Sequence, residues 1–331
     1  MEIIVAQNAG FCFGVARATA AVEQEMANHP EGERIFTLGR LIHNEDYNQC
    51  LAAGGVSVIG VDAVEDLAAQ ATPEAPVKIF VRAHGMTKET EELLESCASA
   101  NPSFSYVDCT CSFVKKIHRI CTSHNEMDQN MRKKGERDCQ MLLVLGSADH
   151  PEVVGFLSRF DGKKYVFSSA AQFEAMIADG SIPTDGSLTP VLVAQTTQNI
   201  NEWKKTKKIY NLNFSKTYLY DTICNITDSR QTEAAELARK CDHIVVIGGR
   251  DSSNSAKLYT ICKNICADTV WVERADELSE ICPPCRKVGV VAGASTPHDI
   301  IEEVTNKMSE IMNENFAELL LFLEERFNHR L

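Results

Sequence analysis

The chain has 331 residues, which is enough for two or three domains with a substantial buried core. Its 44% hydrophobic and 24% charged residues are ordinary for a soluble globular protein. The net charge of −13 argues against nucleic acid as a main partner, because phosphate backbones attract basic surfaces.

The first residues, MEIIVAQNAG, include an acidic residue and no basic run before a short apolar stretch, so we expect no signal peptide. No apolar run approaches about 18 residues, so we expect no membrane-spanning helix. Both observations favour a cytoplasmic protein. In that compartment thirteen cysteines indicate metal binding or catalysis rather than a disulfide framework. The alternative is that many of them are buried thiols that act as small apolar residues.

Three strands along the chain each run into a cysteine, and the elements that follow repeat in the same order. The stretch EIIVAQNAGFCFGV leads to Cys12, SYVDCTCSFV leads to Cys111, and YLYDTICNIT leads to Cys224. After each cysteine come a helix-like stretch and an apolar strand with a polar loop at its end. A further strand–helix passage then leads to another strand with a polar loop.

Short β-branched runs separated by helices predict parallel sheets with crossover helices. We therefore predict an α/β fold of three similar small units with mostly parallel sheets around one centre. These units are residues 1–107 with Cys12, residues 108–220 with Cys111, and residues 221–312 with Cys224. A single alternating α/β domain could mimic the same order of elements.

Two further stretches are predicted from their composition. Residues 121–139 are polar and are predicted to be a surface extension between a helix and a strand. Residues 313–331 have apolar side chains at helical spacing and are predicted to be a C-terminal helical tail that packs against the body or another chain.

The three matched cysteines, Cys12, Cys111 and Cys224, can converge if the three units face a common centre. Three thiolates suit an iron–sulfur cluster with one iron that lacks a protein ligand, or a zinc ion with an open position. Three buried thiols without a metal are the alternative. Cys109 could replace Cys111 as a ligand, but the shared Asp-x-x-Cys pattern favours Cys111.

A second cysteine set consists of Cys262, Cys266, Cys282 and Cys285, and its spacing loosely resembles a structural zinc site. The last two, separated by two prolines, could also be a redox pair. The first two have the i, i+4 spacing of a buried helix face, so the sequence leaves open whether this set binds a metal. The remaining cysteines show no pairing pattern and are predicted to be packing thiols: Cys50, Cys97, Cys121, Cys139 and Cys241.

Polar loops follow the predicted strands, where ligands gather in parallel α/β sheets. They carry hydrogen-bond donors that suit a diphosphate: His43, Asn44, His84, His150, Thr196, Thr197, Ser252, Ser253, Asn254 and Ser295. Glu152 is the one carboxylate in a His/Pro loop of this kind, which makes it the candidate proton donor beside a hydroxyl such as that of Thr196. Each loop alone is a weak signal, since a single His is more often structural and Ser-Ser-Asn is more often a helix cap.

The motifs GFCFGVARA, LIHNE, VRAHG, DCTCSFV, HPEVVG, QTT, DTICNITDSRQ, SSNS and GAST stand in this order over roughly residues 1–310. Together they resemble the 4-hydroxy-3-methylbut-2-enyl diphosphate reductase family of the methylerythritol phosphate pathway to isoprenoids. The resemblance implies a pseudo-threefold trefoil of α/β units around a central [4Fe-4S] cluster held by Cys12, Cys111 and Cys224. The open iron would bind the substrate hydroxyl group, which two electrons and two protons remove as water. The products would be isopentenyl diphosphate and dimethylallyl diphosphate.

The resemblance also implies roles for the loop residues. Glu152 would deliver protons, with Thr196 or Thr197 close to the substrate hydroxyl and His150 at the reacting end. The diphosphate would be held by His43, His84, His150, Ser252, Ser253, Asn254 and Ser295. The family often has Ala at the position of Cys109.

No G-x-G-x-x-G stretch follows a predicted strand, so the electrons are expected from a ferredoxin or a flavodoxin-like protein. No nucleic-acid or membrane partner is expected. Two other functions remain compatible with the cysteines. One is a zinc-dependent hydrolase of a phosphorylated metabolite, which three Cys ligands plus Glu152 would serve. The other is a redox-sensing iron–sulfur protein without catalysis.

Overall fold

The computed structural model describes residues 2–135, 140–215, 218–278 and 287–311. These residues contain three four-stranded sheets, and every pair of neighbouring strands is parallel. The predicted α/β class with three parallel sheets is therefore confirmed. The chain divides into two compact units. Unit 1 comprises the residues before Phe13, residues 43–45, and the residues from Ser229 onward; unit 2 comprises Phe13–Ile42 and Asp46–Asp228.

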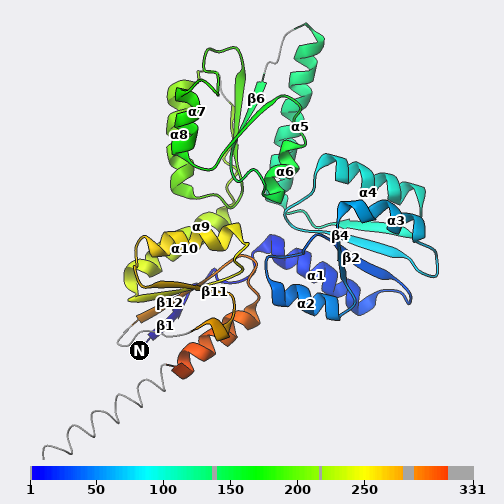
Figure 1. Ribbon diagram of the computed structural model, residues 1–331, viewed down its shortest axis with the longest axis vertical. Helices are drawn as coiled ribbons and strands as arrows, with labels where there is room; N and C mark the ends of the chain where they lie inside the picture. Colours follow the sequence, from blue (N-terminus) through cyan, green and yellow to red (C-terminus); the bar gives the residue numbers. More distant parts are fainter. Residues whose placement is uncertain (1, 136–139, 216–217, 279–286, 312–331) are drawn as a thin grey trace, which may run out of the picture. The chain divides into compact units, whose positions relative to one another are not determined.

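The first sheet of unit 2 has the strand order β3-β2-β4-β5. Its strands are β2 (Arg34–Leu38), β3 (Ser57–Ile59), β4 (Val77–Val81) and β5 (Phe104–Asp108). Figure 1 shows α3 and α4 on one face of this sheet and α1 and α2 on the other. These helices are α1 (Phe13–Asn28), α2 (Glu45–Ala53), α3 (Val64–Gln70) and α4 (Lys88–Ala100), with a short 3-10 turn at Val61–Ala63.

The second sheet of unit 2 has the order β7-β6-β8-β9. Its strands are β6 (Gln140–Leu145), β7 (Lys163–Phe167), β8 (Thr189–Ala194) and β9 (Tyr218–Leu219). Its helices are α5 (Ser112–Lys133), α6 (Pro151–Leu157), α7 (Ala170–Ala178) and α8 (Ile200–Asn213). All of β6 is buried because helices cover both faces, as expected for a central parallel strand.

Alternate side chains of β6 separate the two cores of this sheet. Leu143 packs with Phe173 and Trp203 of α7 and α8. Leu142 packs on the other face with Phe156 of α6 and Ile117 of α5. Figure 1 shows the same two pairs of helices on opposite faces of β6.

The sheet of unit 1 has the order β1-β12-β10-β11. It pairs β1 (Glu2–Val5) with β12 (Lys287–Ala292), and continues to β10 (His243–Ile247) and β11 (Thr269–Val272). The helices α9 (Asn225–Lys240) and α10 (Ser253–Lys263) pack on the face that carries Ile244. Helical residues 298–311 pack on the opposite face, and a 3-10 turn lies at Ala275–Glu277.

The strand before each matched cysteine is an edge strand of its sheet: β1 before Cys12, β5 before Cys111, and β9 before Cys224. Each of these strands pairs with the last of three strands that are consecutive in the sequence. The repeat of elements in the sequence is therefore a repeat of sheet topology. The unit boundaries at residues 107, 220 and 312 stay a prediction.

The stretch 121–139 differs from its prediction as a surface extension. Residues up to Lys133 belong to α5, and Cys121, His124 and Asp128 are buried on one face of the helix. Gln140 supplies the polar contacts that allow this burial: its side chain pairs with His124 Nδ1 at 2.7 Å, and its backbone N–H donates to Asp128 Oδ1 at 2.9 Å. The predicted tail, residues 313–331, lies outside the described residues.

Within the described ranges, none of the helices combines the length and the apolar character that a membrane-spanning segment needs.

Candidate active site

The three matched cysteines make the same backbone hydrogen bond in all three sheets. In unit 1, the N–H of Cys12 donates to Ala294 O at 3.1 Å, just after β12. In unit 2, the N–H of Cys111 donates to Ala83 O after β4, and that of Cys224 donates to Thr196 O after β8, both at 3.0 Å. Each bond fixes a cysteine at the carboxyl end of its sheet, beside a polar loop, which is where parallel α/β sheets place their ligands.

The three cysteines are also partly exposed, and each lies at the start of a helix. Cys111, for example, is the N-cap residue of α5. A helix N-terminus favours negative charge, so these positions suit thiolate ligands. Most of the other described cysteines are buried instead: Cys109, Cys121, Cys241, Cys262 and Cys266.

Cys109 occupies a different environment from Cys111 two residues later. Its side chain is 3% exposed, and burial raises the pKa of its thiol to about 11. Arg17 holds the turn by donating to the carbonyl oxygens of Cys109 and Thr110 at 3.0 and 2.5 Å. These contacts fit a packing role for Cys109.

Glu152 and Thr196, predicted as a pair, are in direct contact. Glu152 is 1% exposed in the first turn of α6. The Thr196 backbone N–H donates to Oε1 at 2.6 Å, and the Thr196 hydroxyl donates to Oε2 at 2.9 Å. A carboxyl group this deeply buried needs such partners, and the hydroxyl bond is a short path for a proton. The Thr197 hydroxyl accepts instead from Gln195 Nε2, so Thr196 is the threonine bonded to Glu152.

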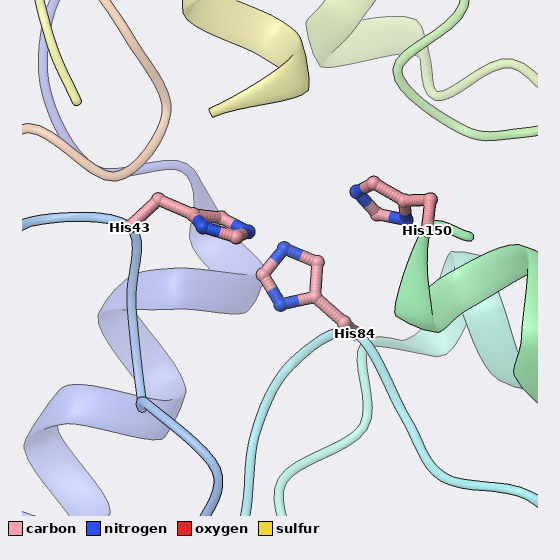
Figure 2. A group of neighbouring side chains, drawn as sticks. All are labelled: His43, His84 and His150. Atoms are coloured by element: carbon pink, nitrogen blue, oxygen red, sulfur yellow. The ribbon is translucent and has the colours of Figure 1, made fainter. Parts of the chain in front are cut away.

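His150 and His84 lie beside this pair in unit 2. Figure 2 shows His84 on the loop after β4 and His150 at the start of α6; the third labelled ring, His43, belongs to unit 1. The His84 and His150 ring centroids are 5.5 Å apart, with the rings nearly perpendicular at 75°. His150 Nδ1 accepts from the Glu152 N–H at 3.2 Å, so the proton of the neutral ring lies on Nε2, which can donate to an anion.

In unit 1, the predicted diphosphate donors other than His43 follow β10 and β12, which are paired strands: Ser252, Ser253 and Asn254 lie at the start of α10, and Ser295 lies on the loop after β12. Ser252 caps α10 by accepting from the Ser255 N–H, so the helix-cap interpretation of this serine is correct. Asn254 is 5% exposed, and its Nδ2 has no hydrogen-bond partner among the described residues. A buried amide donor without a partner is rare and points to a ligand or water that would satisfy it. Ser295 is 6% exposed on the loop after β12.

Two residues that the sequence analysis missed orient these donors. Asp251 Oδ2 lies 3.0 Å from His43 Nδ1, and Lys257 Nζ donates to Ser253 Oγ at 2.6 Å. The i, i+4 spacing of Ser253 and Lys257 on a helix was a signal that could have revealed the second pair. The Asp251 contact joins residues far apart in the chain and leaves no local signal.

The second cysteine set is only partly described. Cys262 and Cys266 are buried in the apolar core beneath α9 and α10, which agrees with the buried-face interpretation. Cys282 and Cys285 lie outside the described residues.

His118 of α5 lies against the loop that carries His84 and against α6, which carries Glu152. A Cβ atom at Gly85 would lie 3.0 Å from His118 Cε1, and one at Gly155 would lie 3.2 Å from Nε2. Gly85 also has a φ of +83°, so its place is set by backbone conformation as well as by space. His118 is 8% exposed; burial, with Arg159 nearby, lowers its pKa to about 3. The ring is therefore neutral at pH 7 and acts as a packing surface.

These features define a class: an α/β protein of three parallel sheets, with a thiol at the carboxyl edge of each sheet and a buried acid–hydroxyl pair in one of them. The family model described as "LytB protein" matches residues 3–309. The chain belongs to the LytB protein family.

Three similar proteins illustrate the family. Each is named 4-hydroxy-3-methylbut-2-enyl diphosphate reductase. The Citrifermentans bemidjiense protein is 37% identical, with 94% of this chain and 98% of that protein covered. The Caldanaerobacter subterraneus protein is 34% identical, with 95% and 99% covered. The Clostridium acetobutylicum protein is 34% identical over 98% of this chain, which spans 47% of the length of that relative.

Two solved structures are similar in fold. One, titled as (E)-4-hydroxy-3-methyl-but-2-enyl diphosphate reductase, the terminal enzyme of the non-mevalonate pathway, has a TM-score of 0.60 and 30% identity, with 94% of this chain and all of that chain covered. The other, the E-1-hydroxy-2-methyl-but-2-enyl-4-diphosphate reductase from Plasmodium falciparum, has a TM-score of 0.72 and 22% identity, with 92% and 87% covered. Both have the fold observed here.

The depressed pKa of His118 predicts a specific loss of stability in acid. The unfolded chain binds a proton at this residue near pH 6.5, whereas the folded chain does not until about pH 3. Stability is therefore fully present above pH 6.5 and is lost as the pH falls below it. Between pH 7.5 and 5.5 the free energy of unfolding of the wild type should fall by about 1.4 kcal/mol more than that of His118→Gln.

Urea unfolding at the two pH values measures this difference, with His29→Gln as the control because His29 is exposed. An equal pH dependence in wild type and His118→Gln would show that His118 is protonated in the folded chain.

Proposed function

We propose that this chain reduces 4-hydroxy-3-methylbut-2-enyl diphosphate to isopentenyl diphosphate and dimethylallyl diphosphate. The observation that carries the proposal is the matched hydrogen bond of Cys12, Cys111 and Cys224, which gives three equivalent thiols in three equivalent sheets. Relatives with this reductase name that match nearly the whole chain support the same reaction.

The three cysteines fit a [4Fe-4S] cluster as its protein ligands. Their partial exposure leaves the sulfurs accessible, and their helix N-terminal positions favour thiolate charge. Three thiolates leave one iron without a protein ligand. When bound, such a cluster supplies electrons and a Lewis-acidic iron for the substrate hydroxyl group.

On this proposal, the diphosphate is bound by side-chain hydrogen-bond donors. In unit 2 these are His84 and the Nε2–H of His150, which its Nδ1 contact with the Glu152 backbone orients. In unit 1 they are His43, Ser252, Ser253, Asn254 and Ser295, with Lys257 behind Ser253. The buried Asn254 Nδ2, which has no hydrogen-bond partner among the described residues, supports this proposal because a phosphate oxygen would accept its hydrogen bond.

Proton delivery falls to Glu152 and Thr196. Removal of the hydroxyl group as water requires a proton at its oxygen, because hydroxide is a poor leaving group. Glu152 is buried away from bulk water, and the Thr196 hydroxyl connects it to the substrate side of the loop. The carbonyl oxygen of Thr196 also accepts the Cys224 N–H. Thr196 therefore contacts both the proposed proton donor, Glu152, and a candidate cluster ligand, Cys224.

Glu152→Gln should lower kcat by about a hundredfold or more while substrate binding and the cluster survive, because the amide keeps the shape but cannot deliver a proton. The measurement is anaerobic turnover with a reduced viologen dye, together with substrate-induced spectral change. Glu174→Gln is the matched control on the exposed face of α7. Normal turnover of Glu152→Gln would remove Glu152 from the proton path.

The assignment of Cys111 over Cys109 gives a second prediction. Cys111→Ser should lose most of its iron and sulfide, whereas Cys109→Ser should keep them, because only Cys111 has the hydrogen bond shared by the three matched cysteines. Iron and sulfide per chain after anaerobic purification measure the difference. Loss of the cluster in Cys109→Ser with retention in Cys111→Ser would reverse the assignment.

A further inference from the structure

Positively charged side chains gather on one surface of unit 2, although the whole chain carries a net charge of −13. They lie on the first turns of α5 and on the outer side of α8. We call this set the basic patch; its members are Lys115, Lys116, Arg119, Lys204, Lys207 and Lys208.

Contacts with Asp221 bring the two helices of the basic patch together. Lys116 Nζ of α5 donates to Asp221 O at 3.5 Å, and Lys207 Nζ of α8 lies 2.8 Å from Asp221 Oδ1. Arg119 follows Lys116 by three residues, and Lys204 precedes Lys207 by three, so each lies next to its partner on the same helix surface. The cations therefore form one surface rather than two.

Carboxylates compensate only part of this charge. Asp108 pairs with Lys115, and Asp221 with Lys207. The side chains of Arg119, Lys204 and Lys208 are exposed and take part in no hydrogen bond or ion pair within the described ranges. The basic patch thus keeps a net positive charge in an acidic chain, which attracts an acidic partner over a distance of roughly a Debye length.

The basic patch adjoins both candidate cluster ligands of unit 2. The N–H of Lys115 donates to Cys111 O at 2.9 Å in the first turn of α5. Asp221, which is contacted by Lys116 of α5 and by Lys207 of α8, precedes Cys224 by three residues. A partner bound here would lie next to the two segments that carry these thiols.

The surface is hollowed beside Lys115 and Arg119. A cavity of about 350 Å³ is lined by these two cations and Arg159, by the hydroxyls of Thr122 and Ser123, and by the carboxylates of Glu91, Asp108 and Glu126. Within this lining Lys115 pairs with Asp108 and Arg159 with Glu91, so Arg119 is the cation that has no carboxylate partner among the described residues. A docked partner would therefore meet a hollow beside the basic patch as well as its positive charge.

The proposed reaction needs such a partner. Removal of the hydroxyl group as water consumes two electrons and two protons, so two one-electron carriers are oxidised for each product. Small iron–sulfur and flavin carrier proteins with acidic surfaces match the charge of the basic patch. We propose that this patch is the docking surface for an acidic electron-carrier protein, an inference that rests on the proposed reductase function.

The test compares two sources of electrons. The patch variant is Arg119→Glu/Lys204→Glu, which reverses two exposed charges that take part in no described contact. The control is Lys133→Glu/Lys134→Glu, an identical charge change on exposed residues roughly 25 Å further along α5. Each protein is reduced either by a viologen dye or by reduced ferredoxin or flavodoxin. Binding of the oxidised carrier is also titrated, with and without added salt.

The patch variant should lose about tenfold or more of the carrier-dependent kcat/KM and of the carrier affinity, while its dye-supported rate stays within about twofold of the wild type. The control should keep both rates, and salt should weaken carrier binding to the wild type more than to the patch variant. Equal carrier dependence in wild type and patch variant would overturn the docking surface. Tighter binding of a single-stranded nucleic acid than of the carrier would overturn it in favour of a different polyanion. Absence of dye-supported turnover in the wild type would instead refute the proposed reductase function.

Discussion

The hydrogen bond from each matched cysteine to the loop after the neighbouring strand is the contact on which the proposed chemistry depends. It closes the carboxyl end of an edge strand against the next strand, at Ala294 for Cys12, Ala83 for Cys111 and Thr196 for Cys224. A parallel sheet leaves little freedom there, because the strand register fixes which residues meet at its edge. Because the three sheets share one topology, each of them fixes its cysteine through the same backbone hydrogen bond.

The buried Glu152 is the second constraint, and it depends on the first. A carboxyl group that is 1% exposed is costly unless its oxygens have partners, and Thr196 supplies one for each oxygen. The same threonine accepts the Cys224 N–H, so a change in the sheet edge would disturb the acid and the thiol together. On the proposed function, proton supply and metal ligation would be coupled through this one short segment of backbone.

The sequence predicted the parallel sheets well. Buried strands such as MLLVL and HIVVI are short runs of β-branched residues or leucine, and such runs separated by helices are typical of parallel sheets. The polar loops after the strands also predicted that Glu152 lies beside a hydroxyl such as that of Thr196. The sequence could not show that β1 pairs with β12, since pairing between opposite ends of the chain leaves no local pattern. The burial of Cys121, His124 and Asp128 on one face of α5 was missed because composition does not reveal that Gln140 supplies partners for His124 and Asp128. The contact between His43 and Asp251 also joins residues far apart in the chain, so no local sequence pattern predicts it.

The most direct measurement of the central claim is the iron, sulfide and zinc content of anaerobically purified protein, with visible and spin-resonance spectra before and after 4-hydroxy-3-methylbut-2-enyl diphosphate is added. Three thiolates that hold a [4Fe-4S] cluster with one open iron predict brown protein, matching iron and sulfide, and a cluster signal that changes with the substrate. Colourless protein with stoichiometric zinc, even after cluster reconstitution, would contradict the assignment of Cys12, Cys111 and Cys224 as cluster ligands and the reductase function built on them.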